Sequence, residues 1–420
     1  MAVKPSEMSH CGVHFTVFTQ NNSFFLLAIT RMVSLKSEYE NGWEIKDILP
    51  VYSTGVKTHR DHFVTDFELS SLHKRIEDFR NLFIKDETIA EQYELQDTRD
   101  WKLSTKRQSL AANTDWESFF TKCLYRPFDI RDYYHYADIV EFPRNEVMQH
   151  MLAGYNVGIA TTRAVEIGRG WEHILCSNKV IQHHTVSLKE TNYFFPLYLY
   201  PDSKVPQETN QPANGPGKRT HNLSTGFIDH ITALVGMTFE PDDRGNLWTT
   251  FGPEDILHYM YAVFHSPMYR ERYAEFLKVD FPRLPLTSNE GLFRALCQLG
   301  ERLVGLHLME ERGAITTRFP EAGNNIVEKV EYAQPADNPE RGRVWINKTQ
   351  YFEGVPPAVW DFSIGGYQVC QRWLKDRKGR ALSFADMKHY QLVVAALAET
   401  LTLMEKIDKV IDEYGGWPLV

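Results

Sequence analysis

The sequence predicts an α+β fold in which a β-rich middle segment lies between two largely helical segments. Residues 66–83 carry apolar side chains at helical spacing, and so do residues 383–416. Residues 123–201 instead carry short apolar and β-branched runs separated by turns, which is typical of strands. The chain has 420 residues, which is enough for two or three domains with a sizeable core.

Residues 1–120 are expected to form the first unit. Residues 1–50 indicate short strands and turns, and "SFFLLAI" (Ser23–Ile29) indicates a buried element too short to cross a membrane. After Asp66 the apolar positions predict an amphipathic helix with a solvated charged face. The charge-rich residues 85–120 predict further helix. The apolar positions after Asp66 are Phe67, Leu69, Leu72, Ile76, Phe79 and Leu82.

Residues 121–226 are expected to form a β-rich unit. "NVGIATTRAV", "HILCSNKVIQHHTVSL" and "YFFPLYLY" indicate strands. His183 and His184 are adjacent, so on a strand they would point to opposite faces and would not jointly hold a metal. Residues 201–226 are polar and rich in Pro, Gly and Asn, which predicts a flexible linker.

Residues 227–420 are expected to be mostly helical. One helical pattern breaks at Pro267, and another begins with a capping box at Thr287 and Glu290. "RGRVWINKTQYFEGV" indicates a β-hairpin. The final helix is expected to end at Gly415 and Gly416. Its apolar stripe comprises Met387, Tyr390, Val394, Leu397, Leu401, Met404, Ile407 and Ile411.

The composition is that of a globular protein, with 43% hydrophobic residues, 24% charged residues and a net charge of −9. This charge argues mildly against a general polyanion binder, but a DNA-reading protein needs only a local basic face. The five cysteines are scattered without a Cys-x-x-Cys pair. A disulfide framework or structural zinc site is therefore not expected, and a reducing cytoplasm fits best.

No catalytic motif stands out. Gly217–Arg219 fails as a phosphate-binding loop because Pro212 and Arg219 replace the required residues. Pro356 and Pro357 lack the neighbours of an amino-methyltransferase motif, and Glu44–Lys46 has no Asp upstream for a metal nuclease. We therefore expect no catalytic residue, metal site or cofactor in this chain.

Four stretches combine cations with glycines or aromatic residues. Guanidinium groups and lysines contact phosphates or guanine edges, so these stretches are candidates for DNA binding. Structural alternatives remain open: Arg–Asp pairing with Asp129 and Asp132, a turn with a cationic tip, and a solvated basic surface. The tyrosine-rich stretch 125–145 also contains Arg144. The candidate DNA-binding residues are Lys57, Arg60, Arg126, Arg131, Arg163, Arg169, Lys375, Arg377, Lys378 and Arg380.

Taken in order, several segments resemble the C-terminal specificity region of type ISP restriction–modification enzymes and of fused N6-adenine DNA methyltransferases. They include "EYENGWEIKDILPVYSTGVKTHRDHFVTDF", "YRPFDIRDYYHY", "YFFPLYLYPD" and "LCQLGERLVGLHLME". The longest is "GRVWINKTQYFEGVPPAVWDFSIGGYQVCQRWLKDRKGRALSFADMKHYQ".

The resemblance implies that residues 1–120 are a methyltransferase tail and helical coupler, and that residues 121–226 form a target-recognition subdomain. Residues 227–420 would complete the specificity region. The chain alone should bind no S-adenosylmethionine. It should bind double-stranded DNA and act with a methyltransferase or nuclease subunit, in the cytoplasm and away from membranes. Two alternatives remain: a truncated remnant or docking protein that binds a methyltransferase partner rather than DNA, and an independent enzyme with an unrecognised site.

Overall fold

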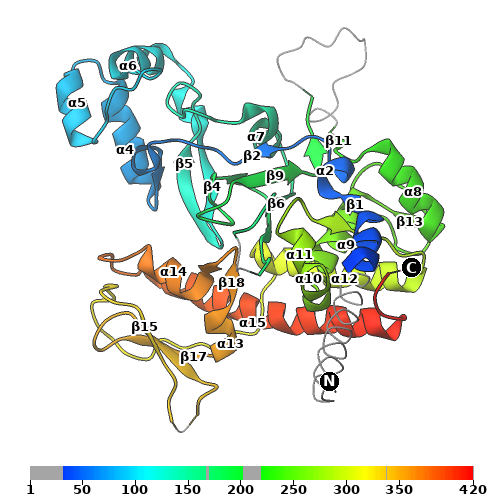
Figure 1. The fold of residues 1–420 in the computed structure, drawn as a ribbon. Helices are drawn as coiled ribbons and strands as arrows, with labels where there is room; N and C mark the ends of the chain where they lie inside the picture. Colours follow the sequence, from blue (N-terminus) through cyan, green and yellow to red (C-terminus); the bar gives the residue numbers. More distant parts are fainter. Residues whose placement is uncertain (1–31, 167–169, 202–218, 337, 420) are drawn as a thin grey trace, which may run out of the picture.

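The computed structural model describes residues 32–166, 170–201, 219–336 and 338–419, which form a mixed assembly of helices and small sheets (Figure 1). The predicted α+β class is confirmed. Ser23–Ile29 lies outside the described residues, as does most of the predicted linker. No helix within the described ranges is long and apolar enough to cross a membrane.

The first helical segment lies at the upper left of Figure 1. It contains α4 (Leu69–Arg80), α5 (Asp86–Gln92) and α6 (Leu103–Ala112). The core-facing side of α4 buries Leu72, Ile76 and Phe79, as its periodicity predicts. Upstream, residues 32–40 are helical, so the expectation of only strands and turns in residues 1–50 was wrong there.

Two four-stranded sheets occupy the centre of the molecule. One has the order β2-β9-β6-β7 and the other β3-β5-β4-β8. Strand β6 is buried along its whole length, as expected for an inner strand. The strands are β2 (Ser53–Thr54), β3 (Thr65–Asp66), β4 (Phe120–Arg126), β5 (Asp129–Tyr134), β6 (Gly158–Thr162), β7 (Ile174–Ser177), β8 (Val180–Ile181) and β9 (Asn192–Pro196).

Three long helices pack together in the C-terminal region: α9 (Pro253–His265), α12 (Glu290–His307) and α15 (Phe384–Glu413). Helix α9 is buried on all sides, because α12, α15 and α10 (Pro267–Arg272) surround it. The helical break at Pro267 is confirmed. The predicted capping box was wrong, because the N-cap of α12 is Asn289, whose side chain accepts a hydrogen bond from the Leu292 amide.

Between α12 and α15 the chain forms a small sheet of β15 (Glu331–Ala333), β16 (Gly342–Trp345) and β17 (Tyr351–Val355). The predicted hairpin is β16–β17. It is followed by α13 (Pro357–Asp361), the hairpin β18 (Ser363–Ile364)–β19 (Tyr367–Gln368) and α14 (Val369–Lys375). Gly365 and Gly366 make the hairpin turn with φ of 56° and 75°, a conformation that favours glycine.

Short elements complete the connections. Helix α7 packs on β8 and β9, and β1 pairs with β14. These elements are β1 (Trp43–Glu44), α2 (Ile45–Ile48), α3 (Asp61–Val64), the 3₁₀ turn Trp116–Phe119, α7 (Asn145–Leu152), β10 (Tyr198–Leu199), β11 (Thr220–His221), α8 (Thr225–Val235), β12 (Thr238–Phe239), β13 (Thr250–Phe251), α11 (Ala274–Leu277) and β14 (Arg283–Leu284).

Candidate nucleic-acid interface

Three loops from separate regions of the chain are joined by backbone hydrogen bonds. The Lys57 and Phe142 backbones exchange two bonds, of 3.1 and 3.0 Å. The His183 amide donates to the Val56 carbonyl at 2.8 Å. A Cβ atom at Gly55 would lie 2.5 Å from the Gln182 carbonyl oxygen, so only glycine allows this close approach. Residues 55–59, 141–144 and 182–184, together with Arg126, are called the loop face below.

Three cations of the loop face have no carboxylate within ion-pair distance among the described residues. The Lys57 ammonium lies 6.0 Å and the Arg144 guanidinium 5.3 Å from the centre of the Phe142 ring. Arg126 donates to the side-chain oxygen of Gln182 at 2.9 Å and to the Tyr125 carbonyl. All three side chains are partly exposed. Their charges are therefore available to an external anion.

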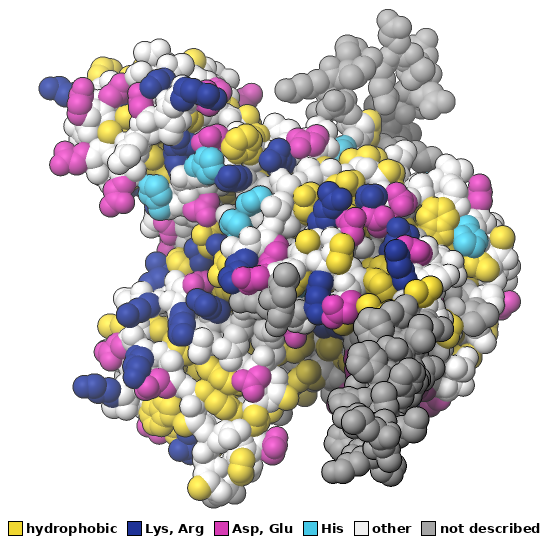
Figure 2. Space-filling view, in the orientation of Figure 1, with side chains coloured by type: hydrophobic (Ala, Val, Ile, Leu, Met, Phe, Trp, Pro, Cys, Tyr) yellow, Lys and Arg dark blue, Asp and Glu magenta, His cyan; other side chains and the backbone are white. Residues whose placement is uncertain are grey.

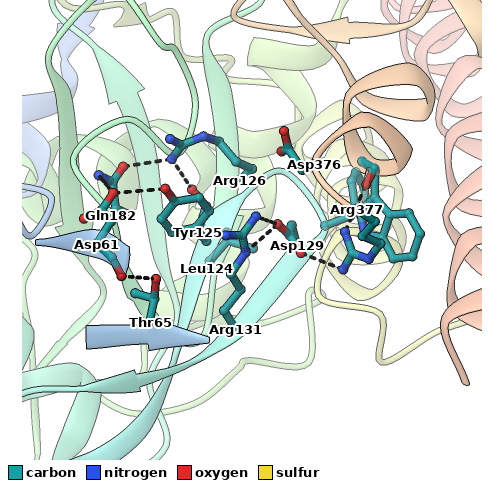
Figure 3. Close-up of polar contacts among 12 residues, drawn as sticks. Asp61, Thr65, Leu124, Tyr125, Arg126, Asp129, Arg131, Gln182, Asp376 and Arg377 are labelled. Carbon is teal, nitrogen blue, oxygen red and sulfur yellow. Dashed lines mark hydrogen bonds and ion pairs between the residues drawn. The ribbon is translucent and has the colours of Figure 1, made fainter. Parts of the chain in front are cut away.

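A hydrogen-bond network holds Arg126 in place (Figure 3). Asp61, the first residue of α3, accepts from the Tyr125 hydroxyl at 3.0 Å and from the Gln182 amide nitrogen at 3.2 Å. Burial, together with Asp61, raises the pKa of Tyr125 to about 12, so its hydroxyl remains a donor at neutral pH. Gln182 thus directs its oxygen to Arg126, and the guanidinium is oriented by neutral partners.

His183 and His184 add two imidazoles to this face. They lie in a turn after β8, with ring centres 4.6 Å apart, so the prediction of strand residues on opposite faces was wrong. Burial, followed by the charges of His184, Lys57 and Arg144, lowers the pKa of His183 to about 4. Burial also lowers the pKa of His184. Both rings are therefore neutral near pH 7 in the free protein.

A second cluster of cations is arranged differently. Asp129 is fully buried and accepts from Arg131 at 2.7 Å and from Arg377 at 2.8 Å (Figure 3). The guanidinium groups of Arg131, Arg377 and Arg380 lie 4.3–4.7 Å from the centre of the Phe67 ring. These five residues are called the arginine joint. It fastens the connection between α14 and α15 to the β4–β5 hairpin.

Carboxylates neutralise most of the charge at the arginine joint. Burial alone would raise the pKa of Asp129, but Arg377 and Arg131 outweigh it and hold the pKa below its ordinary value. Arg380 lies 3.6 Å from Glu68, although its side chain is partly exposed. The joint is therefore a mainly structural cluster, and the Arg–Asp pairing proposed from the sequence holds for Asp129, whereas Asp132 pairs with Lys122.

Two clefts border the β4–β5 hairpin. One of about 530 Å³ is lined partly by Asp66, Phe67, Arg75 and Arg380, and one of about 270 Å³ by Arg126, Arg372, Asp376 and others. Both include Tyr125 and Arg131. Figure 2 shows the molecule hollowed on its left side, between the α4–α6 segment and α14, with Lys and Arg side chains around the hollow.

The structure distributes the remaining candidate residues over several places. Arg60 is buried, with 4% of its surface exposed, and stacks 3.8 Å from the Trp101 ring centre. Arg163 pairs with Asp280 outside the loop face. Lys375 donates to Gln371, and Lys378 is exposed on the outer side of the arginine joint. Arg169 lies outside the described residues.

Thus, of the candidate residues that the structure describes, Lys57 and Arg126 alone lie on the loop face. Arg131, Arg377 and Arg380 meet at the arginine joint, where Arg377 is 5% exposed. The DNA-binding residues predicted from the sequence did not include Arg144, His183 or His184. The signal for Arg144 was its place at the end of the tyrosine-rich stretch, but no spacing rule places residue 144 beside residue 57.

The described residues hold no cluster of three or more His, Cys, Asp or Glu side chains suited to a metal ion. Cys123, Cys176, Cys297 and Cys370 are buried free thiols. Burial raises the pKa of the Cys123 thiol above its ordinary range, which disfavours the nucleophilic thiolate.

Comparison with known proteins gives a consistent result. Among solved structures, the ATP-dependent Type ISP restriction-modification enzyme LlaBIII bound to DNA has a TM-score of 0.64 and 15% identity, covering 88% of this chain and 24% of that one. The DrdV–DNA complex has a TM-score of 0.63 and 20% identity, covering 87% and 36%.

A nuclease-deletion mutant of the Type ISP enzyme LlaGI, in complex with a DNA substrate mimic, has a TM-score of 0.59 and 18% identity. The matched region covers 88% of the present chain and 29% of the LlaGI chain. The present chain thus spans about a quarter to a third of these neighbours. No curated protein matches.

The family model of the Type ISP C-terminal specificity domain matches residues 47–406, which contain both the loop face and the arginine joint. The family resemblance inferred from the sequence is confirmed, and the chain belongs to the Type ISP C-terminal specificity domain family.

Proposed function

We propose that this chain is the sequence-specific double-stranded DNA recognition module of a Type ISP restriction–modification system. The observation that carries the proposal is the set of three cations, Lys57, Arg126 and Arg144, that lie on one face and have no carboxylate partner in the described part of the chain. Adenine methylation and DNA cleavage would be supplied by regions of the enzyme outside this sequence. Such a system acts on intracellular DNA, so we propose a cytoplasmic location.

The chemistry of the loop face suits a duplex. Lysine and arginine neutralise phosphates and fix the register of the protein, while an oriented arginine or glutamine reads base edges in the major groove. Arg126 and Gln182 are held by the Asp61 network, and this preorganisation lowers the cost of ordering them on binding. A net charge of −9 does not oppose this, because charges more than about 10 Å away are largely screened at 0.1 M salt.

Selection from randomised duplex DNA at two salt concentrations tests the proposal. We expect an enriched short sequence, and an affinity that falls with salt. The plot of log affinity against log salt has a negative slope. In the triple variant Lys57→Ala, Arg126→Ala, Arg144→Ala, this slope should become shallower by about 3 if each cation contacts one phosphate. Lys409→Ala removes an exposed lysine on α15 and should leave the slope unchanged.

Enrichment of a sequence without any effect of the triple variant would move recognition to another face. Failure of the purified chain to bind any duplex at low salt would contradict DNA recognition by this chain alone. Co-purification with a methyltransferase subunit under those conditions would favour a docking protein, which was the alternative raised from the sequence.

A further inference from the structure

Phe142 is an exposed aromatic residue with two cations beside its ring. Its side chain is 39% exposed, and it lies between the cations Lys57 and Arg144 described above. The His59 ring meets it edge-on at 5.8 Å. An aromatic ring that stays exposed to water does not gain the free energy of burial. A ring exposed on a cationic surface is therefore a candidate for contact with a ligand.

The backbone fixes the direction of this ring. Phe142 exchanges two hydrogen bonds with Lys57, and the following residue is Pro143, which restricts the conformation before it. His59 is itself held by a 2.7 Å contact with Glu141. The ring and its surrounding cations therefore form one preorganised unit rather than a mobile loop tip.

We infer that Phe142 inserts its ring against an opened base step of the bound duplex, while Lys57 and Arg144 hold the flanking phosphates. The inference rests on the proposed function and deepens it. Phenylalanine wedges that separate a pair of stacked bases are a known way in which proteins bend DNA, and the lost stacking is recovered on the ring. A base step that opens easily would then be preferred at this position even without hydrogen bonds to its edges.

Other exposed aromatic residues offer a contrast. Trp248 is 69% exposed, but its ring is covered on one side by Arg294 at 3.7 Å, and it lies between β12 and β13, away from the three loops. Substitution of Trp248 therefore provides a matched control for the loss of an exposed aromatic residue next to an arginine.

The test uses the purified chain and duplexes of the selected sequence, with 2-aminopurine placed at each position in turn. The fluorescence of this base is quenched when it is stacked and rises when it is unstacked. We expect binding to raise the emission at the two neighbouring positions that flank the opened step. Phe142→Ala should abolish that rise and weaken affinity about tenfold, with the salt slope unchanged because no charge is lost.

Phe142→Leu keeps an apolar side chain and should preserve the fold, yet it should recover only a fraction of the emission change. Trp248→Ala should bind and fluoresce as the parent does. Binding of the parent protein without an emission rise at any position would overturn the wedge while leaving DNA recognition intact. The same holds if Phe142→Ala keeps the full rise. Absence of DNA binding by the parent protein would instead overturn the proposed function, and the wedge with it.

Discussion

The loop face and the arginine joint both gather arginines and aromatic rings beside the β4–β5 hairpin, but they differ in where their negative charges lie. At the joint, Asp129 and Glu68 are within ion-pair distance of the arginines. On the loop face, Lys57, Arg126 and Arg144 have no carboxylate within ion-pair distance among the described residues, and Glu141 pairs instead with His59 and Arg60. The difference teaches that a basic cluster becomes a candidate anion site only where the fold leaves its charge uncompensated.

The largest expected effect is on folding, and it comes from the joint. Asp129→Asn removes the charge that Arg131 and Arg377 share in a buried position, which leaves Arg131 without its ion-pair partner and Arg377 with only the more distant Asp386, at 3.8 Å. We expect the free energy of unfolding to fall by about 3–5 kcal/mol, measured by urea denaturation. As a control, Asp100→Asn breaks an exposed Arg–Asp pair and should leave the free energy of unfolding nearly unchanged. Equal, small effects of the two variants would refute the structural assignment of the joint.

Two arginines five positions apart on the hairpin sharpen the comparison. Arg126→Ala should weaken DNA affinity about tenfold, the expected loss for one charge-assisted contact, and should change stability by less than about 1 kcal/mol. Arg131→Ala should instead lower stability by about 1–3 kcal/mol, because a buried carboxylate loses a partner. Fluorescence anisotropy with labelled duplex and urea denaturation measure the two quantities. If the two variants lose DNA affinity and stability in the same proportion, the proposed difference between the loop face and the arginine joint is wrong.

A smaller effect concerns pH. We expect a phosphate near His183 and His184 to favour the protonated imidazole, and therefore to raise the pKa of His183 above its value of about 4 in the free protein. Binding then takes up protons, and affinity should rise several-fold as pH falls from 7.5 to 5.5. His183→Asn with His184→Asn should flatten this dependence. If the DNA affinity of the unsubstituted protein does not depend on pH, His183 and His184 lie outside the interface.

The low pKa of His183 also makes the stability of the free protein depend on pH, and stability should fall as pH falls, whereas DNA affinity should rise. The folded-state pKa of His183 lies below its unfolded value of about 6.5, so the unfolded chain binds the proton more tightly. The stability contribution of the neutral ring is complete above pH 6.5 and is lost as pH falls toward 4. Circular dichroism should therefore be recorded at each pH, to verify that the protein is still folded when its DNA affinity is measured.

The smallest effect is expected at the outer surface of the joint. Lys375 and Lys378 are exposed, and Lys375 donates to Gln371 at the surface. Lys375→Ala with Lys378→Ala should change stability by no more than about 0.5 kcal/mol. DNA affinity should change far less than in the loop-face triple variant. A loss of affinity as large as that of the triple variant would place the duplex across the joint as well.

The sequence predicted the elements that depend on local pattern. The apolar stripe of α15, the amphipathic face of α4 and the β16–β17 hairpin follow from residue spacing, because burial of one face imposes a period of 3.6 or 2. The capping residue of α12 and the helix at residues 32–40 were missed. Short polar signals such as Thr287 and Asn289 compete within one turn, and tertiary packing decides between them.

Family membership also followed from the order of segments in the sequence, and the candidate cations Lys57 and Arg126 were identified there. Sequence alone could not say which cations are compensated. Arg377 and Asp129 are 248 positions apart, and Lys57 and Phe142 are joined only by the backbone pairing of two loops. Charge compensation acts through space over a few ångströms, so the tertiary structure alone decided that the cations of one cluster are paired with carboxylates and those of the other are not.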